Sequence, residues 1–356
     1  QNNRINNPSN GWNALLYDSN QRYIHILSCF FFPPDLPARA NFTPDSNSQW
    51  ASLGAWLPLF SMSGVIATLQ SRSKHWYKTM LTILFTMALV PILNSAFQLF
   101  NASYYARWYY MLTLMMSLAT VACLQREDVD WGRAIRWTLA ITLIIGLSIG
   151  LMPTITTDSA SGKQTVFYGL EKYPTRFWAY VAIALVSLLL LIIIFKYYRY
   201  HKKLFLRMAT GGVAVIAVVY SLFYITTGKT QSDNTHREII PYALNNGADI
   251  HLPSDGRQFC RIDVYDGMDN LPMFWKRPTI QAFHSIVPGS IMEFYPTIGV
   301  TRDVGSRPSV DVYAIRGLLS CQWLFDPINH GQDFVDPGTS KTRMPRSEER
   351  RVGKEC

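Results

Sequence analysis

Long apolar blocks separated by short polar stretches fill the chain from about residue 52 to residue 227. A transmembrane helix needs about 20 mostly apolar residues, with a usable range of roughly 17 to 25. Six blocks match this length closely, and the fifth contains the unbroken run LVSLLLLIIIF. The predicted spans are Ser52–Leu69, Thr79–Phe97, Trp108–Leu124, Trp137–Met152, Phe177–Phe195 and Met208–Thr227. The pattern predicts an α-helical polytopic membrane protein with about six transmembrane helices over residues 52–227.

Two local features depart from this regular pattern. The stretch Ile24–Phe32 (IHILSCFFF) is apolar but too short to cross a membrane, and two prolines follow it. We expect it to be an interfacial or re-entrant piece of an external loop region that comprises residues 1–51. Pro91 lies inside the second predicted span, where its missing N–H is expected to kink the helix.

Residues beyond the sixth span have the composition of a soluble α/β module. Thr235–Asn246 has a Thr cap, apolar residues at helical spacing and a following Gly247, which together predict a helix. Phe259–Tyr265 (FCRIDVY) alternates between apolar and polar positions, which predicts a strand. A late strand and an apolar segment are expected in VDVYAIRGLLSCQWLF. We therefore expect a C-terminal α/β domain over residues 228–345.

The two ends of the chain also affect its interpretation. Gln1 opens a polar, Asn-rich stretch without an initiator Met or a signal-type apolar region, so we expect a C-terminal fragment of a longer protein. Residues 346–356 (RSEERRVGKEC) resemble the conceptual translation of a sequencing adapter. We exclude that segment from functional reasoning.

Lys and Arg are distributed unevenly among the loops that the six spans define. Cytoplasmic loops of membrane proteins carry an excess of these residues. One set of alternate loops holds eleven of them: Arg72, Lys74, Lys78, Arg126, Arg133, Arg136, Lys196, Arg199, Lys202, Lys203 and Arg207. The other set holds four: Arg107, Lys163, Lys172 and Arg176. The asymmetry predicts that residues 1–51 and the C-terminal domain both lie on the extracytoplasmic side.

Composition narrows the functional class. Charged residues make up only 16% of the 356 residues, against about 25% in an average soluble domain, and hydrophobic residues make up 49%. The formal net charge of +9 is explained by membrane topology, because no basic face with motif support for nucleic acid is present. Five cysteines are too few for a disulfide scaffold. We favour unpaired thiols for Cys260 and Cys321. A disulfide bridge between them is the alternative.

Signatures of common soluble enzymes are absent from the sequence. It contains no Gly-rich phosphate loop, HExxH motif, paired CxxC or nucleophile elbow, and its histidines do not cluster at metal-ligand spacing. The external carboxylates Asp35, Asp45, Asp158 and Glu171 are scattered, and loop solvation is their expected role. No Asp, Glu, Lys or Arg lies inside the six spans, which disfavours ion-coupled transporters and proton pumps.

Polar and aromatic residues mark the outer end of the second and third spans. The candidate substrate-binding residues there are Asn94, Tyr104, Tyr105 and Arg107. Arg107 lies in the set of loops that carries few basic residues, so its presence there calls for a local reason. A guanidinium at the outer headgroup level suits bidentate capture of a phosphate or pyrophosphate. Arg176, at the outer start of the fifth span, is a further candidate. The alternative to substrate binding is that the side chain of each arginine extends to the lipid headgroups (snorkelling). We favour that alternative for each of the two arginines taken singly.

Two regions of the chain resemble the YfhO family of bacterial membrane proteins. The first is PILNSAFQLFNASYYARWYYML, residues 91–112. The second is the C-terminal domain, where FCRIDVY is followed by TIQAFHSIVPGSIMEFYPTIG and later by GLLSCQWLF. The individual motifs are loose, but the order of many spans and then this domain covers nearly all of residues 50–327.

The resemblance implies a GT-C-type glycosyltransferase of the bacterial cell membrane, in which a polyprenyl-phosphate-linked sugar is used on the outer face. Some family members are implicated in glycosylating wall polymers such as lipoteichoic acid. The implied partners are thus membrane lipid, the lipid-linked sugar donor and a cell-wall polymer acceptor. Such enzymes usually carry a catalytic Asp in a first external loop, expected upstream of this chain, so neither a catalytic base nor a cofactor is assigned. A non-catalytic scaffold or flippase partner, and less favoured a transporter, are the alternatives.

Overall fold

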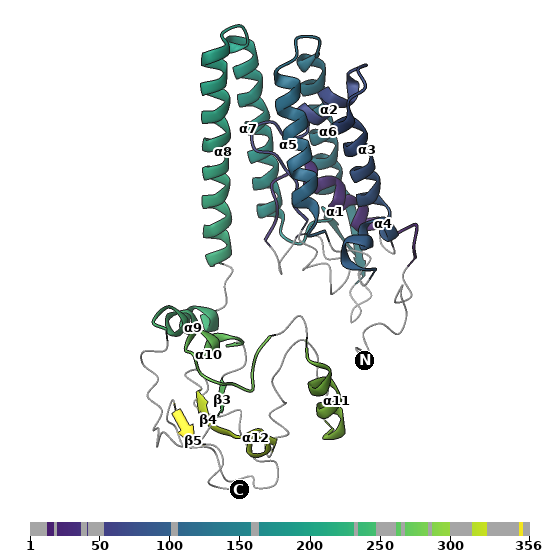
Figure 1. Ribbon diagram of the computed structural model, residues 1–356. Coiled ribbons are helices and arrows are strands. Elements are labelled where there is room, and N and C mark those ends of the chain that lie inside the picture. The colour runs from purple at the N-terminus through teal and green to yellow at the C-terminus, as the bar shows by residue number, and fades with distance from the viewer. Residues whose placement is uncertain are drawn as a thin grey trace. The chain divides into compact units, whose positions relative to one another are not determined.

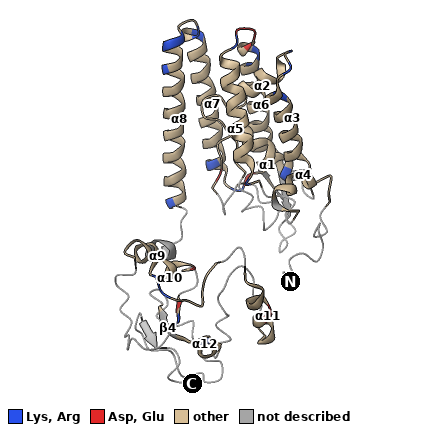
Figure 2. Ribbon diagram, viewed as in Figure 1, with Lys and Arg blue, Asp and Glu red and all other residues tan. Residues whose placement is uncertain are grey.

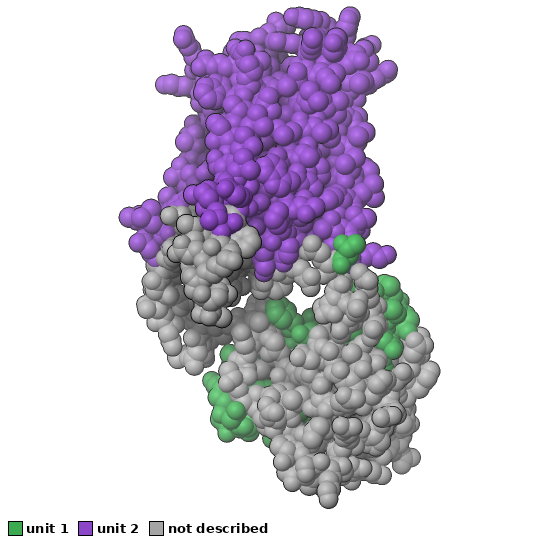
Figure 3. Space-filling view, turned by 180° about the vertical axis from the view of Figure 1, so that it is seen from behind, with its two compact units in different colours: residues 1–4, 230–356 green, residues 5–229 purple. Residues whose placement is uncertain are grey.

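The computed structural model describes residues 13–17, 20–36, 41, 53–100, 106–157, 164–230, 234–246, 261–264, 268–283, 287–299, 315–325 and 349–351. The chain divides into two compact units, whose described parts lie within residues 5–229 and residues 230–356. Figure 3 shows the first unit in purple and the second in green. We call them the helical bundle and the C-terminal unit and describe each separately.

The helical bundle is built from eight described α-helices and one β-hairpin (Figure 1). The helices are α1 Asn20–Phe31, α2 Ser63–Gln70, α3 Trp76–Leu89, α4 Pro91–Ser95, α5 Tyr109–Leu124, α6 Trp131–Leu151, α7 Pro174–Tyr198 and α8 Lys202–Thr230. A 3₁₀ turn, η2 Ala96–Gln98, follows α4. Strands β1 Pro153–Thr157 and β2 Gln164–Tyr168 pair antiparallel between α6 and α7.

Three described helices are long and apolar enough to cross a membrane. They are α6, α7 and α8, with 21, 25 and 29 residues. They contain the last three predicted spans almost entirely, because uninterrupted apolar runs of this length favour a single helix. Helix α5 is apolar but shorter, with 16 residues. The total of six spans stays a prediction.

The first predicted span, Ser52–Leu69, differs from the structure. Helix α2 begins only at Ser63, and Leu53–Met62 forms irregular chain. Pro58 accounts for much of this break, because proline lacks an N–H donor and disfavours the helical conformation of the preceding residue. Leu59 and Ser61 adopt left-handed backbone angles, with φ of 69° and 47°, and both are fully buried. The expectation of one continuous helix here is wrong.

Pro91 has a stronger effect than the expected kink. Helix α3 ends at Leu89, Val90 is extended, and Pro91 is the first residue of the separate helix α4. Proline is well placed at a first helical position, because the N–H that it lacks would have no acceptor there. The second predicted span is therefore divided into α3 and α4.

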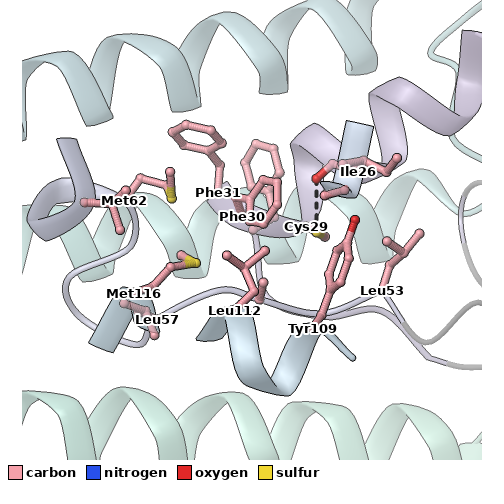
Figure 4. Close-up of a cluster of buried hydrophobic side chains, with 14 of the residues drawn as sticks. Ile26, Cys29, Phe30, Phe31, Leu53, Leu57, Met62, Tyr109, Leu112 and Met116 are labelled. Atoms are coloured by element: carbon pink, nitrogen blue, oxygen red, sulfur yellow. Dashed lines mark hydrogen bonds between the residues drawn. The ribbon is translucent and has the colours of Figure 1, made fainter. Parts of the chain in front are cut away.

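Helix α1 lies in the core of the bundle and contains all but the last residue of the short apolar stretch noted in the sequence. Its Phe30 ring stacks on Tyr109 of α5 at 6.0 Å between centroids and meets Phe85 of α3 edge-on at 5.2 Å. Figure 4 shows Phe30 and Phe31 of α1 among Leu112 and Met116 of α5. Aromatic side chains of α1 thus fill the space between neighbouring helices.

Basic residues gather at one end of the bundle, where the chain passes from α2 to α3, from α5 to α6 and from α7 to α8 (Figure 2). We call this the basic end and the opposite end, which carries the β1–β2 hairpin, the hairpin end. Arg126 joins two connections of the basic end, because its guanidinium pairs with Asp128 and hydrogen-bonds Ser71 Oγ at 3.1 Å. Lys78 Nζ donates to the carbonyl of Leu69 at 2.9 Å, which satisfies a group at the end of α2.

The C-terminal unit contains short helices and a three-stranded sheet. Its described elements are α9 Asn234–Leu244, β3 Arg261–Val264, α10 Leu271–Phe274, α11 Gly289–Thr297, α12 Ile315–Leu318, β4 Cys321–Phe325 and β5 Glu349–Arg351. Strand β4 pairs parallel with β3 and antiparallel with β5. Asp263 and Arg316 form an ion pair of 2.8 Å inside this unit, with both side chains fully buried. Cys321 is buried, and Cys260 lies outside the described residues, so the alternative of a bridge between them stays open.

Candidate functional site

Asp35 and Arg176 meet at the hairpin end of the bundle although 141 residues separate them in the chain. Asp35 follows the two prolines after α1, and Arg176 lies in the first turn of α7. Arg176 Nε lies 2.8 Å from Asp35 Oδ1, and Arg176 Nη2 donates to Asp35 Oδ2 at 3.2 Å. Tyr180, one turn further along α7, donates to Asp35 Oδ1 at 3.0 Å.

Asn41 completes this group, which we call the Asp35 cluster: Asp35, Asn41, Arg176 and Tyr180. The backbone N–H and the side-chain amide of Asn41 donate to Asp35 Oδ2 at 2.6 and 2.9 Å. The side-chain carbonyl of Asn41 accepts from the backbone N–H of Tyr173 at 2.8 Å. Asn41 therefore ties the segment after α1 to the segment before α7.

The contacts of Asp35 decide what its carboxylate can do. A carboxylate has about four lone-pair sites, and Asp35 accepts from Asn41, Arg176, Tyr180 and its neighbour Leu36. A group so fully occupied is unsuited to take a proton from a substrate. Arg176 is likewise not available to a ligand, because its side chain is 3% exposed and its charge is balanced by Asp35. The cluster positions the segments at the hairpin end of the bundle and does not present a free charge.

Two expectations from the sequence are corrected here. Arg176 does not snorkel toward lipid headgroups, because it is buried, ion-paired and stacked 4.3 Å from the ring centroid of Tyr173. Asp35 is not a solvated loop residue, because its side chain is only 14% exposed. Neither outcome is visible from local sequence, since the partner lies on a distant segment.

A small cavity adjoins the cluster between α1 and α7. It measures about 30 Å³, and its wall includes His25, Ser28, Asp35, Asn41 and Tyr180. One water molecule needs at least about 10 to 15 Å³ of such volume. The cavity therefore admits one or two water molecules and is too small for a sugar ring.

Glu171 is a second buried carboxylate at the hairpin end. Its residue exposure is 9%, and its Oε2 atom has no hydrogen-bond partner among the described residues. Burial raises the pKa of this carboxyl above its ordinary value. Gly169 makes room for it, because a Cβ at Gly169 would lie 2.6 Å from either carboxylate oxygen, and the φ of 105° there favours glycine. The expected role of Glu171 in loop solvation is therefore wrong.

Arg107 lies in a different part of the hairpin end, in the turn before α5. Its side chain is exposed and lines an open hollow of about 570 Å³ together with Gly54, Ala106, Tyr109, Tyr110 and Thr113. This volume is within the range of about 300 to 1,000 Å³ that small-molecule pockets occupy. Of the cations named as candidates, Arg107 is the exposed one.

Asn94 supports the turn that carries Arg107. It is 1% exposed, and its side-chain carbonyl accepts from Trp108 Nε1 at 2.6 Å. Trp108 also stacks on Phe97 at 4.5 Å between ring centroids. Asn94 therefore fixes the residue next to Arg107 and does not line the hollow. Tyr104 and Tyr105 lie outside the described residues.

Comparison with known proteins identifies the family. The long apolar helices and the concentration of basic residues at one end of the bundle define the class, a helical membrane protein. The model of a family described as bacterial membrane protein YfhO matches residues 36–316, and the chain belongs to that family. A search of the curated proteins and a search of the solved structures each gave no match.

Proposed function

We propose that this protein is a cell-envelope glycosyltransferase that takes a sugar from a polyprenyl-phosphate carrier at the hairpin end of the bundle and transfers it to a wall polymer such as lipoteichoic acid. The observation that carries the proposal is the exposed guanidinium of Arg107 in an open hollow beside Tyr110. Membership of a family of bacterial membrane proteins supports a role in the envelope.

Arg107 would bind the phosphate of the donor. A guanidinium offers a planar fork of N–H donors that matches two phosphate oxygens, which a lysine ammonium does not reproduce. Tyr110, which is 73% exposed, suits the boundary between apolar and hydrated surroundings, where tyrosine is enriched. The hollow is large enough for a sugar next to this phosphate. Asn94 would keep the turn in place through Trp108.

In this proposal, the distribution of basic residues sets the orientation of the bundle in the membrane. Basic loops favour the cytoplasmic side, so the basic end would face the cytoplasm and the hairpin end the outside. The protein would then be a multi-pass protein of the bacterial cell membrane. Helix α8 begins at the basic end and would cross the membrane once. The C-terminal unit, which follows α8, would therefore be extracytoplasmic.

A non-catalytic scaffold or flippase partner is the second candidate. The observation in its favour is that Asp35, a carboxylate at the hairpin end, has its oxygens occupied by donors. In that case Arg107 would hold the carrier phosphate without any transfer. A transporter is the weaker alternative.

The experiment compares wild type with Arg107→Lys and Arg107→Ala in cells at matched membrane levels, measuring incorporation of labelled sugar into wall polymer. Hydrogen bonds to charged groups contribute about 1.5 to 3 kcal/mol, so each variant should lose about tenfold to hundredfold in incorporation. Lys172→Gln is the control, because Lys172 is exposed at the same end but does not line the hollow. Wild-type incorporation by both Arg107 variants would remove this site assignment.

Transfer of the sugar by purified protein separates the two candidate functions. A glycosyltransferase and a carrier-binding scaffold both need Arg107 for phosphate binding, but only the enzyme transfers the sugar in purified form. Purified full-length protein in liposomes with a radiolabelled polyprenyl-phosphate sugar and isolated polymer should therefore label the polymer. Donor binding without transfer would support the scaffold.

A further inference from the structure

The start of α6 presents a second open hollow, at the basic end of the bundle. It measures about 430 Å³ and is lined by Arg133, Arg136, Trp137 and Ala140. These positions follow the spacing i, i+3, i+4 and i+7, so they share one face of the helix. A single helix face thus carries two guanidiniums, then an indole, then a small side chain.

Neither guanidinium of this hollow has an ion pair or hydrogen bond among the described residues. Two of the three acidic residues in the connection before α6 are engaged elsewhere: Asp128 pairs with Arg126, and Asp130 Oδ1 accepts from the backbone N–H of Arg133 at 2.9 Å. The third, Glu127, is exposed and forms no ion pair with either arginine among the described residues. Like charges one turn apart repel each other, and cations near a helix N-terminus oppose the helix dipole. A bound anion would relieve both effects.

The same face of α6 continues as an apolar stripe. Ile144, Leu147 and Leu151 are 63%, 47% and 55% exposed. Trp137, which is 51% exposed, lies between the arginines and this stripe, as expected of an indole at a membrane interface. The order along the helix is therefore cationic, interfacial and aliphatic, which complements a molecule with an anionic head and a hydrocarbon chain.

We propose that this face of α6 is a binding site for an anionic phospholipid. Arg133 and Arg136 hold the phosphate of the headgroup, Trp137 packs at the level of the glycerol, and an acyl chain lies along Ile144 and Leu147. Clusters of basic residues at a membrane surface attract anionic headgroups, and guanidiniums bind phosphate oxygens in pairs. A phosphatidylcholine headgroup is a poorer ligand, because its ammonium is repelled by the two arginines. The site is separate from the Arg107 hollow and does not depend on the proposed transferase activity.

The test uses the purified protein in nanodiscs of phosphatidylcholine that contain a minority of one brominated lipid. Quenching of Trp137 is isolated by subtracting the signal of Trp137→Phe. Brominated phosphatidylglycerol should quench Trp137 more strongly than the same fraction of brominated phosphatidylcholine. Arg133→Gln/Arg136→Gln should weaken phosphatidylglycerol binding by at least about tenfold, as expected on losing charge-assisted hydrogen bonds.

Two further variants make the result specific. Arg133→Lys/Arg136→Lys keeps both charges but loses the planar fork, so its selectivity should fall between those of wild type and the glutamine variant. Lys202→Gln/Lys203→Gln removes two exposed charges from α8 at the same end and should leave quenching unchanged. Equal quenching of wild type by the two brominated lipids would overturn the proposal. Displacement of brominated phosphatidylglycerol by inorganic phosphate would also overturn it, because the site would then take a free anion.

Discussion

Arg176 Nε and Asp35 Oδ1 lie 2.8 Å apart with side chains only 3% and 14% exposed. Removing one partner of such a pair leaves the other charge buried without compensation, which typically costs about 3 to 5 kcal/mol. We predict that Asp35→Asn lowers the free energy of unfolding by about this amount, measured by thermal or denaturant unfolding in detergent. Asp128→Asn removes an ion pair at the surface and should change stability little, since Asp128 is 63% exposed. Equal stability of Asp35→Asn and wild type would show that the pair contributes no net stabilisation.

Gly64 packs against Thr120 so closely that any Cβ at Gly64 would overlap the threonine side chain. Helix propensity favours alanine over glycine by about 1 kcal/mol, but overpacking a core costs about 1 to 3 kcal/mol. We predict that the steric term prevails and that Gly64→Ala lowers the melting temperature. Gly211→Ala is the matched control, because nothing lies within 4 Å of a Cβ there, and it should raise stability slightly. A stabilising effect at both positions would contradict the close approach of α2 and α5.

Glu171 should make stability depend on pH. Burial raises the pKa of its carboxyl in the folded protein above the ordinary value of 4.5. The folded state therefore binds the proton more tightly, so this stabilisation is present below the ordinary pKa and is lost as pH rises through the folded-state pKa. We predict that Glu171→Gln, which stays neutral, becomes more stable relative to wild type as pH rises from 4 toward neutrality. Melting curves of both proteins across this window test it, and parallel curves would contradict the prediction.

The proposed orientation predicts which side of the membrane each end occupies. In a cysteine-free background, a cysteine at Ser254 should react with an impermeant maleimide in intact cells. A cysteine at Lys202, at the basic end, should react only after permeabilisation. Ser254 lies outside the described residues, so the experiment tests the side of the membrane and no contact. The reverse labelling pattern would invert the orientation and place the Arg107 hollow in the cytoplasm.

Much of the bundle could be predicted from apolar length. Helices α6, α7 and α8 correspond to uninterrupted runs whose burial in lipid needs no specific partner. The strands of the hairpin, PTITT and QTVFY, carry the Thr, Val, Ile and aromatic content typical of strands, and this signal could have located them.

Partnership between distant residues could not be predicted in the same way. Hydropathy assigns Asp35 and Glu171 to solvent because it scores each side chain without its environment. Asp35 is buried because Arg176 and Asn41 satisfy it from other segments. The irregular course of Leu53–Met62 is likewise a tertiary outcome, since its apolar composition alone matches a span.

The irregular segment also has a consequence for the biogenesis of the protein. Backbone groups outside a helix cannot be left facing hydrocarbon, so Leu53–Met62 needs surrounding protein if it is to lie within a membrane. Its neighbours come from far downstream: Phe60 meets the ring of Trp131, and a Cβ at Gly212 of α8 would lie 3.2 Å from Leu59. The ribosome makes Gly212 about 150 residues after Leu59, so we expect this early segment to reach its final packing only after α8 has been made.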